Sequence, residues 1–598
     1  MNGFLPITLD EVKRLGWSEV DVVIVSGDAY VDHPCFGTAV LGRCLEDAGF
    51  RVAIIPQPNW RDDLRDFRKF GAPRLFFAVT SGCMDSMVNH YTAARRLRHD
   101  DAYTPGGQFG FRPDRATYVY SRILKQLYPS VPVVIGGIEA SMRRLAHYDY
   151  WDDRLFPSIL IDTPADLLTY GMGEKLIVKI AQMLDSGASI EELKQLPQHA
   201  YRTSLDRLDY YRSLPHTKIL HSFAECQQSK RLHAENYHII ELESNKIECN
   251  TLVQPYDNCL VVVNPPDTPF SEADIDHSFD LPYMRQPHPK YKKRGTIPAF
   301  EMIKFSVNSH RGCFGGCSFC TISAHQGKQI VSRSEKSILR EVDLIVQQPD
   351  FHGTLSDLGG PSANMYRMQG RNRDLCIHCT RYSCIHPTHC PNLNSDHTHL
   401  AKLYQRVANH PKVNHLFIGS GIRYDLFTPQ NGGFDYFRQV VLHHVSGRLK
   451  VAPEHTSSTV LDAMRKPHFD LFLRTKKDFD TICRQAGLRY QLIPYFISSH
   501  PGCKLRDMAE LAVQMKQLGY RLEQVQDFTP TPMTLATEMY YTGYNPATME
   551  PIYVAVHPNE KREQNLLFFY YKRELHPQIK QALLKSHNGQ FLNQLGIR

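Results

Sequence analysis

The chain has 598 residues, 15 cysteines and a formal net charge of +7. This length exceeds what one hydrophobic core supports, so we expect two or three domains. We find no apolar run long enough for a membrane helix and no signal peptide, which predicts a protein outside the membrane. The mild positive charge permits an RNA partner without arguing for one.

Residues 1–190 predict a Rossmann-like α/β domain with a doubly wound parallel sheet. The β-branched run at 20–25 is typical of a buried strand, and an amphipathic helix over 37–48 follows it. Later apolar runs that alternate with helical segments lie at 51–55, 74–79, 131–137 and 167–170.

Residues 191–298 predict a connecting region with short antiparallel strands. Segments 238–243, 250–254 and 260–263 are the strand candidates. The proline-rich stretch 265–298 predicts a linker along the surface.

Residues 299–548 show repeated strand–helix units, which predict a partial (β/α)6 TIM-type barrel. The six strand candidates lie near Phe305, Thr354, Phe417, Lys450, Leu492 and Val525. Reactive groups in such barrels gather at the C-terminal ends of the strands.

Three cysteines directly follow the first of these strands. Cys313, Cys317 and Cys320 form a C-x3-C-x2-C motif, so one tight loop can direct three thiolates to a common point. A four-iron cluster is usually held by four thiolates, and three would leave one iron open to a small molecule. Zinc is the alternative, with His310 or a distant residue as its fourth ligand.

This motif, with the aromatic Phe319 before its last cysteine, resembles the signature of radical S-adenosylmethionine (SAM) enzymes. The resemblance implies a [4Fe–4S] cluster on Cys313, Cys317 and Cys320, with SAM bound to the open iron. It further implies that the reduced cluster splits SAM and generates a 5′-deoxyadenosyl radical. A reductant such as flavodoxin or ferredoxin is then an expected partner.

Three other strand ends provide candidate SAM ligands. Gly359 and Gly360 resemble the glycine-rich SAM motif, although a proline follows where an acidic residue is usual. Arg423, close to Ser420, could pair with the SAM carboxylate, and Glu454 could accept hydrogen bonds from the ribose. The structural alternative for the glycine pair is a plain turn. For Arg423 it is a surface arginine, and for Glu454 it is a helix cap.

The segment 370–396 contains a second group of cysteines: Cys376, Cys379, Cys384 and Cys390. Four thiolates this close can bind zinc or a second iron–sulfur cluster, and their spacing does not separate the two. Free cysteines in a loop are the third reading. A complete shell would leave no open iron, which favours structural support or electron relay. So many cysteines in metal-ligand spacings indicate a reducing, cytoplasmic location.

The segment 357–366, the cysteine-rich insertion and the N-terminal sheet together most closely resemble YgiQ-type radical SAM proteins. The N-terminal layout also resembles a cobalamin-binding domain. However, His33 lies one residue early for the D-x-H-x-x-G signature, so we do not predict cobalt ligation there. A structural or substrate-side domain is predicted instead.

The tail 549–598 combines basic residues with aromatics at 568–571. Such a pattern suits single-stranded nucleic acid, but a helix packed on the barrel explains it as well. The predicted function is a radical SAM enzyme of unknown substrate. The alternatives are a methylthiotransferase-like RNA modification and a non-catalytic iron–sulfur protein for electron transfer or sensing.

Overall fold

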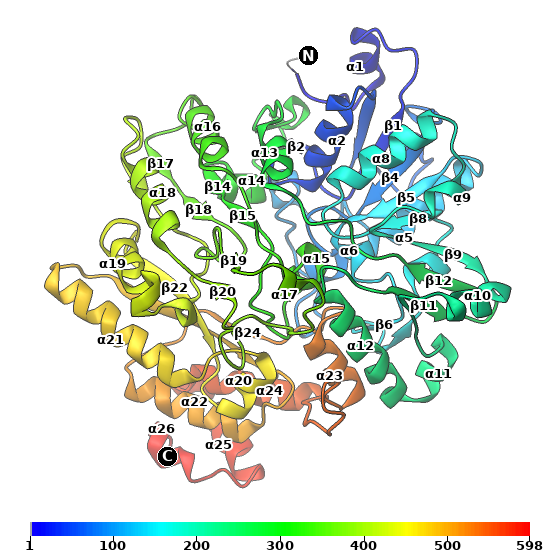
Figure 1. The fold of residues 1–598 in the computed structure, drawn as a ribbon. Coiled ribbons are helices and arrows are strands. Elements are labelled where there is room, and N and C mark those ends of the chain that lie inside the picture. Colours follow the sequence, from blue (N-terminus) through cyan, green and yellow to red (C-terminus); the bar gives the residue numbers. More distant parts are fainter. Residues whose placement is uncertain (1–2) are drawn as a thin grey trace.

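The computed structural model describes residues 3–598 and contains two α/β parts that lie side by side. In Figure 1 the N-terminal part (blue to cyan) is at the upper right and the second part (green to yellow) is at the left. The C-terminal helices (red) lie below the second part. Within residues 3–598, no helix is both long and apolar enough to cross a membrane.

A nine-stranded sheet forms the centre of the N-terminal part, in the order β10-β11-β12-β9-β8-β5-β4-β1-β3. The strands from β8 to β3 are all parallel, whereas β9 and β12 continue the sheet in antiparallel pairing. The strands are β1 (Val22–Ser26), β3 (Val52–Pro56), β4 (Phe76–Thr80), β5 (Val133–Gly136), β8 (Leu167–Thr169), β9 (His199–Ser204), β10 (Thr217–Ile219), β11 (Thr251–Pro255) and β12 (Cys259–Val263).

Helices cover both faces of the parallel strands. Every residue of β1 is buried, because successive side chains of a strand point to opposite faces and both faces are covered. Val22 and Ile24 share a core with α2 (Gly37–Asp47) and α8 (Glu174–Asp185). Val23 and Val25, which point to the other face, share a second core with α5 (Ala116–Leu127).

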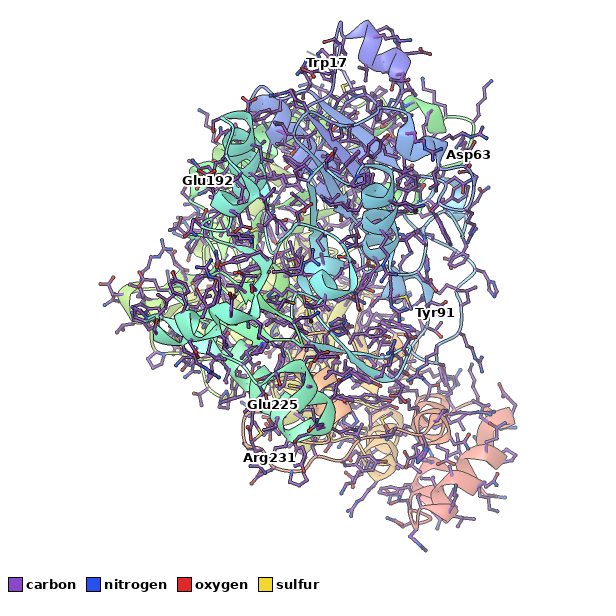
Figure 2. All side chains as sticks on the ribbon, turned by 90° about the vertical axis from the view of Figure 1, so that its right-hand side faces the viewer. Trp17, Asp63, Tyr91, Glu192, Glu225 and Arg231 are labelled. Atoms are coloured by element: carbon purple, nitrogen blue, oxygen red, sulfur yellow. The ribbon has the colours of Figure 1, made fainter. Side chains whose placement is uncertain are left out.

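The predicted strand at 238–243 is wrong, because these residues belong to α12 (Lys230–Ser244). Ser229 caps this helix, and the buried residues Ala234, Tyr237 and Ile240 recur at helical spacing. In Figure 2, Glu225 of α11 (Phe223–Gln228) and Arg231 of α12 lie at the lower edge of the N-terminal part.

The other two predicted strands of this region are confirmed as β11 and β12, which form an antiparallel pair. Both strands extend the N-terminal sheet. The sheet therefore continues past residue 190, where the sequence predicted a boundary.

The stretch 265–298 is more ordered than the linker that its prolines predicted. It contains α13 (Glu272–Asp280), which starts at a capping box of Ser271 and Asp274 and buries Ile275 and Phe279. It also contains β13 (Gln286–Pro287), which pairs with β2 (Val31–Asp32). None of the prolines lies inside α13, so they do not prevent the helix, and Pro287 is part of the short strand β13.

The second part contains strands at all six predicted positions. Its ladders β14–β18, β17–β21 and β22–β23–β24 are all parallel. Helices between the strands pack apolar side chains into a shared core with them. The strands are β14 (Ser306–Asn308), β17 (Thr354–Leu355), β18 (Asp357–Gly359), β21 (His415–Leu416), β22 (Arg448–Glu454), β23 (Gln491–Ser498) and β24 (Val525–Asp527). The helices are α16 (Glu335–Ile345), α18 (Thr398–Ala408), α19 (Gly433–His443), α20 (Ser458–Met464), α21 (Phe469–Gln485), α22 (Leu505–Gln517) and α23 (Leu535–Thr542).

The tail folds into α24 (Pro558–Leu566), α25 (His576–Lys585) and α26 (Phe591–Leu595), and α24 and α26 contact α22. Phe568 is fully buried. The Tyr570 hydroxyl donates to the Tyr520 carbonyl over 2.5 Å. The tail aromatics thus contribute to packing.

Candidate functional site

The cysteine motif lies in the loop between β15 (His310–Arg311) and β16 (Val331–Ser332), just beyond β14. Backbone hydrogen bonds tie this loop to two helices of the second part. The Ser318 amide donates to the Met464 carbonyl of α20 (3.1 Å), and the Ala536 amide of α23 donates to the Ser318 carbonyl (2.8 Å). These two bonds hold Ser318, between Cys317 and Cys320, against both helices.

The three thiols of this loop interact with one another. Burial raises the pKa of Cys320 to about 12, and the neighbouring charges of Cys317 and Cys313 add to the rise. Cys317 Sγ accepts a hydrogen bond from Arg423 Nη1 at 3.2 Å. A Cβ on Gly315 would lie 2.7 Å from that nitrogen, so glycine is needed for this approach. Three clustered thiols beside a cation suit an anionic iron–sulfur cluster.

The predicted glycine pair packs tightly against neighbouring polar side chains. A Cβ on Gly359 would lie 2.4 Å from Ser420 Oγ, and a Cβ on Gly360 would lie 2.5 Å from the His310 ring. The Gly359 carbonyl accepts the Ser309 amide, which comes from the strand that leads into the cysteine loop (2.6 Å). The structure therefore brings Gly359, Gly360 and Ser420 together next to that loop.

Arg423 has a partner that the sequence analysis missed. Its guanidinium forms a two-pronged ion pair with Asp425 (2.9 and 2.5 Å), and its third nitrogen contacts Cys317. The fork that was predicted to hold the SAM carboxylate is thus directed at Asp425. The sequence signal for this ion pair was the spacing R-x-D, which puts an acidic residue two positions after the arginine. Ser420 likewise donates to the carboxylate of Asp357.

Glu454 ends β22 in a left-handed backbone conformation (φ 68°), which is uncommon for a residue other than glycine. Its side chain is buried, and its carboxylate lies 3.7 Å from the Lys466 ammonium. Burial raises the pKa of Glu454. Strained backbone often marks functional sites, which agrees with the predicted position of Glu454 at a strand end.

The cysteine-rich insertion docks directly on the cysteine loop. The Cys384 amide donates to the Phe314 carbonyl (3.1 Å), and a Cβ on Gly316 would lie 2.3 Å from the Tyr382 carbonyl oxygen. All four cysteines of the insertion line a cavity of about 530 Å³. Within residues 3–598, no three Cys, His, Asp or Glu side chains have the spacing of ligands to a single ion. The insertion therefore lies directly on the loop that carries Cys313, Cys317 and Cys320.

A larger cavity of about 570 Å³ separates the N-terminal sheet from the second part. Thr80 and Gly136, at the ends of β4 and β5, line one wall, and His310, Arg311 and Gly360 line another. Ligands of open α/β sheets bind at the carboxyl ends of parallel strands, where this cavity lies.

His33 is not available to a ligand in this cavity. Its ring is buried, with Nδ1 accepting the Cys35 amide (3.2 Å) and Nε2 in contact with Arg285 Nη2 (3.1 Å). Burial and the charge of Arg285 place the pKa of His33 well below its usual range.

Two family models match the chain. The model described as radical SAM N-terminal covers residues 4–306, and a domain of unknown function (DUF3362) covers residues 523–590. The UPF0313 protein of Bacteroides thetaiotaomicron is 56% identical over 100% of this chain and 98% of its own length. The UPF0313 protein of Methanocella arvoryzae is 47% identical over 97% and 95%, respectively.

These matches define a radical SAM protein, as the cysteine motif predicted. The chain belongs to the UPF0313 family.

Two solved structures show a distant overall likeness. The radical SAM methyltransferase TsrM from Kitasatospora setae has a TM-score of 0.49 at 14% identity, over 86% of this chain and 76% of that one. The cobalamin-dependent radical SAM enzyme OxsB has a TM-score of 0.45 at 10% identity, over 88% and 55%.

Proposed function

We propose that this protein is a radical SAM enzyme whose [4Fe–4S] cluster is held by Cys313, Cys317 and Cys320. The observation that carries the proposal is the anchored loop that brings these three thiols together beside Arg423. When bound and reduced, the cluster supplies the electron that splits SAM into methionine and a 5′-deoxyadenosyl radical. A one-electron donor such as flavodoxin or ferredoxin would be the external partner.

The chain's own residues would position SAM around this loop. Gly359 and Gly360 leave backbone room beside the loop, and Glu454 presents a buried carboxyl group suited to ribose hydroxyls. Arg423, which is bound to Asp425, would interact with the cluster rather than with SAM, because its Nη1 donates a hydrogen bond to the Cys317 sulfur. A hydrogen bond from a cation to a ligand sulfur stabilises the negative charge of a cluster.

The parallel ladders that carry these residues favour a partial (β/α)6 barrel with its reactive groups at one end. The substrate would enter through the 570 Å³ cavity, because Gly360 and the cysteine loop form part of its wall. A radical must form next to the atom that it attacks, and this cavity reaches the proposed SAM position.

The insertion would hold a second metal centre on Cys376, Cys379, Cys384 and Cys390. Four thiolates suit either a zinc ion or a second iron–sulfur cluster, and the metal content of the reconstituted protein distinguishes the two. The hydrogen bond between Cys384 and Phe314 supports a position of this centre beside the first cluster, as electron relay would require.

Metal analysis after anaerobic reconstitution tests both centres. We expect about eight irons per chain for two four-iron clusters, and about four in either Cys317→Ala or Cys384→Ala. Zinc in the insertion would instead give about four irons and about one zinc per chain. Cys259→Ala, in the N-terminal sheet, is the matched control and should keep the full iron content. Unchanged iron in Cys317→Ala would contradict the assigned SAM cluster.

A further inference from the structure

A separate, smaller cavity of about 160 Å³ lies between the N-terminal sheet and the segment that follows the cysteine motif. The turn after β8, the segment after α12 and residues 323–329 form its walls. Its volume is comparable with the roughly 150 Å³ of a cavity that holds one benzene molecule. It therefore has room for a small group and not for a nucleotide.

Arg144 lines this cavity and has no carboxylate partner within residues 3–598. The residue is 5% exposed. Its Nη1 donates to the Ser141 carbonyl (2.7 Å), its Nε has no acceptor, and its guanidinium lies 4.8 Å from the Tyr170 ring centre. Burial lowers the pKa of Arg144. A buried charge without a counterion is costly to the fold.

The other fully buried arginines show how this chain normally treats such a charge. Each of them forms an ion pair with a buried carboxylate, in contrast to Arg144. The pairs are Arg43 with Asp32, Arg112 with Asp28, Arg143 with Asp85, and both Arg285 and Arg333 with Glu341.

The remaining groups on the wall do not neutralise Arg144. The Glu243 carboxylate is paired with Lys246 at 2.7 Å, and Asp267 accepts from the Thr268 amide at 2.7 Å. Lys328 adds a second cation, which donates to the Arg381 carbonyl. His325 is buried, and its Nδ1 has no partner. The charged side chains of the wall are three cations, Arg144, Lys246 and Lys328, and two carboxylates, Glu243 and Asp267, so their net formal charge is +1.

We propose that this cavity binds a small oxyanion, a carboxylate or phosphate group, on the guanidinium of Arg144. The planar guanidinium fork matches such oxygens, and the apolar surroundings strengthen a charge-assisted hydrogen bond. The site is distinct from the proposed SAM position, and its occupation does not require an iron–sulfur cluster.

The cavity wall also supports the cysteine loop. Ser323 Oγ donates to the Cys313 carbonyl (2.9 Å), and Gln326 Oε1 accepts the Gly312 amide (3.1 Å). Both residues belong to α15 (Ile322–Gln326), which lines the cavity. A bound anion would thus stabilise the segment that holds Cys313.

Thermal unfolding of the full chain with inorganic phosphate or acetate, each at matched ionic strength against sodium chloride, tests the proposal. We expect at least one of the two anions to raise Tm in a saturable way, and the responding anion identifies the chemistry. Arg144→Met should weaken this response at least tenfold in apparent Kd. It should not lower Tm without anion, because it removes an uncompensated buried charge.

Arg406→Met is the matched control, since this exposed arginine pairs only with Glu335 and should keep the full response. Arg144→Lys retains the charge without the fork, and it replaces Arg144→Met in the binding comparison if that variant does not fold. No saturable response of the wild-type chain to either anion would overturn the proposal. An unchanged response in the substituted chain would overturn it as well.

Discussion

Arg423 is held in place by a short series of buried side chains. The Asn364 amide accepts the Arg423 backbone N–H (2.8 Å) and donates to its carbonyl (3.0 Å). The same Asn364 lies 3.1 Å from Nε2 of His397, which is fully buried. His397 thus contacts Asn364, which binds both backbone polar groups of Arg423.

His397 gives the fold a defined pH dependence. Burial lowers its pKa from 6.5 to about 4. Between pH 6.5 and about pH 4, His397 is protonated in the unfolded chain but neutral in the folded chain. The free energy of unfolding therefore decreases as the pH falls through this range. Compared with His397→Gln, the wild-type advantage should shrink by about 1.4 kcal/mol per pH unit below about pH 6.5. Urea unfolding of both proteins from about pH 7.5 to 5 measures this, and a constant or growing advantage would contradict it.

Among single residues, the sequence predicted the proximity of side chains that are only a few positions apart in the chain. Cys313, Cys317 and Cys320 fall within one loop, so their proximity follows from their positions in the chain. The ion pair of Arg423 with Asp425 was not predicted, because it depends on how the segment after β21 turns. Arg144 gave no sequence signal, since the absence of a partner is visible only in three dimensions.

Among the elements, the contact between the insertion and the cysteine loop depends on Gly316. Gly316 has φ of +64° and closely faces the Tyr382 carbonyl, whereas Gly543, which follows α23, has φ of +76° in the left-handed region and nothing near its Cβ position. Alanine at either site carries the same left-handed strain of about 1–2 kcal/mol. Only Gly316→Ala must also displace the insertion, and we expect it to lose about 1–3 kcal/mol more.

Urea unfolding of the two alanine variants, together with protease cleavage within 370–396, checks this prediction. Gly316→Ala should be less stable and cut faster than Gly543→Ala. Equal losses of stability and equal cleavage would show that the insertion does not need this contact.

The elements also show where periodicity misled. The segment 238–243 is short and partly apolar, so it could not be distinguished from a strand without its helical neighbours 230–237. The proline-rich stretch 265–298 concealed α13 because the prolines flank that helix. The strands and helices of residues 299–548 were predictable because their alternation is regular over six units.

In the whole molecule, the 570 Å³ cavity lies where the two α/β parts meet, between the carboxyl ends of the N-terminal strands and the cysteine loop. The ion pair between Glu174 and Arg311 joins the two walls. The alternating pattern predicted each sheet, whereas their mutual placement depends on contacts between residues far apart in the sequence. A substrate in this cavity would lie beside the proposed SAM position.

The central claim is that the cysteine loop supports cleavage of SAM. The most direct test is 5′-deoxyadenosine release from SAM by anaerobically reconstituted protein with dithionite, next to Cys317→Ala. We predict release by the wild-type protein and loss of that release in the variant, because three thiolates are needed to hold the cluster with one open iron. No release from protein with a complete, reducible cluster would contradict the enzyme assignment and favour electron transfer or sensing.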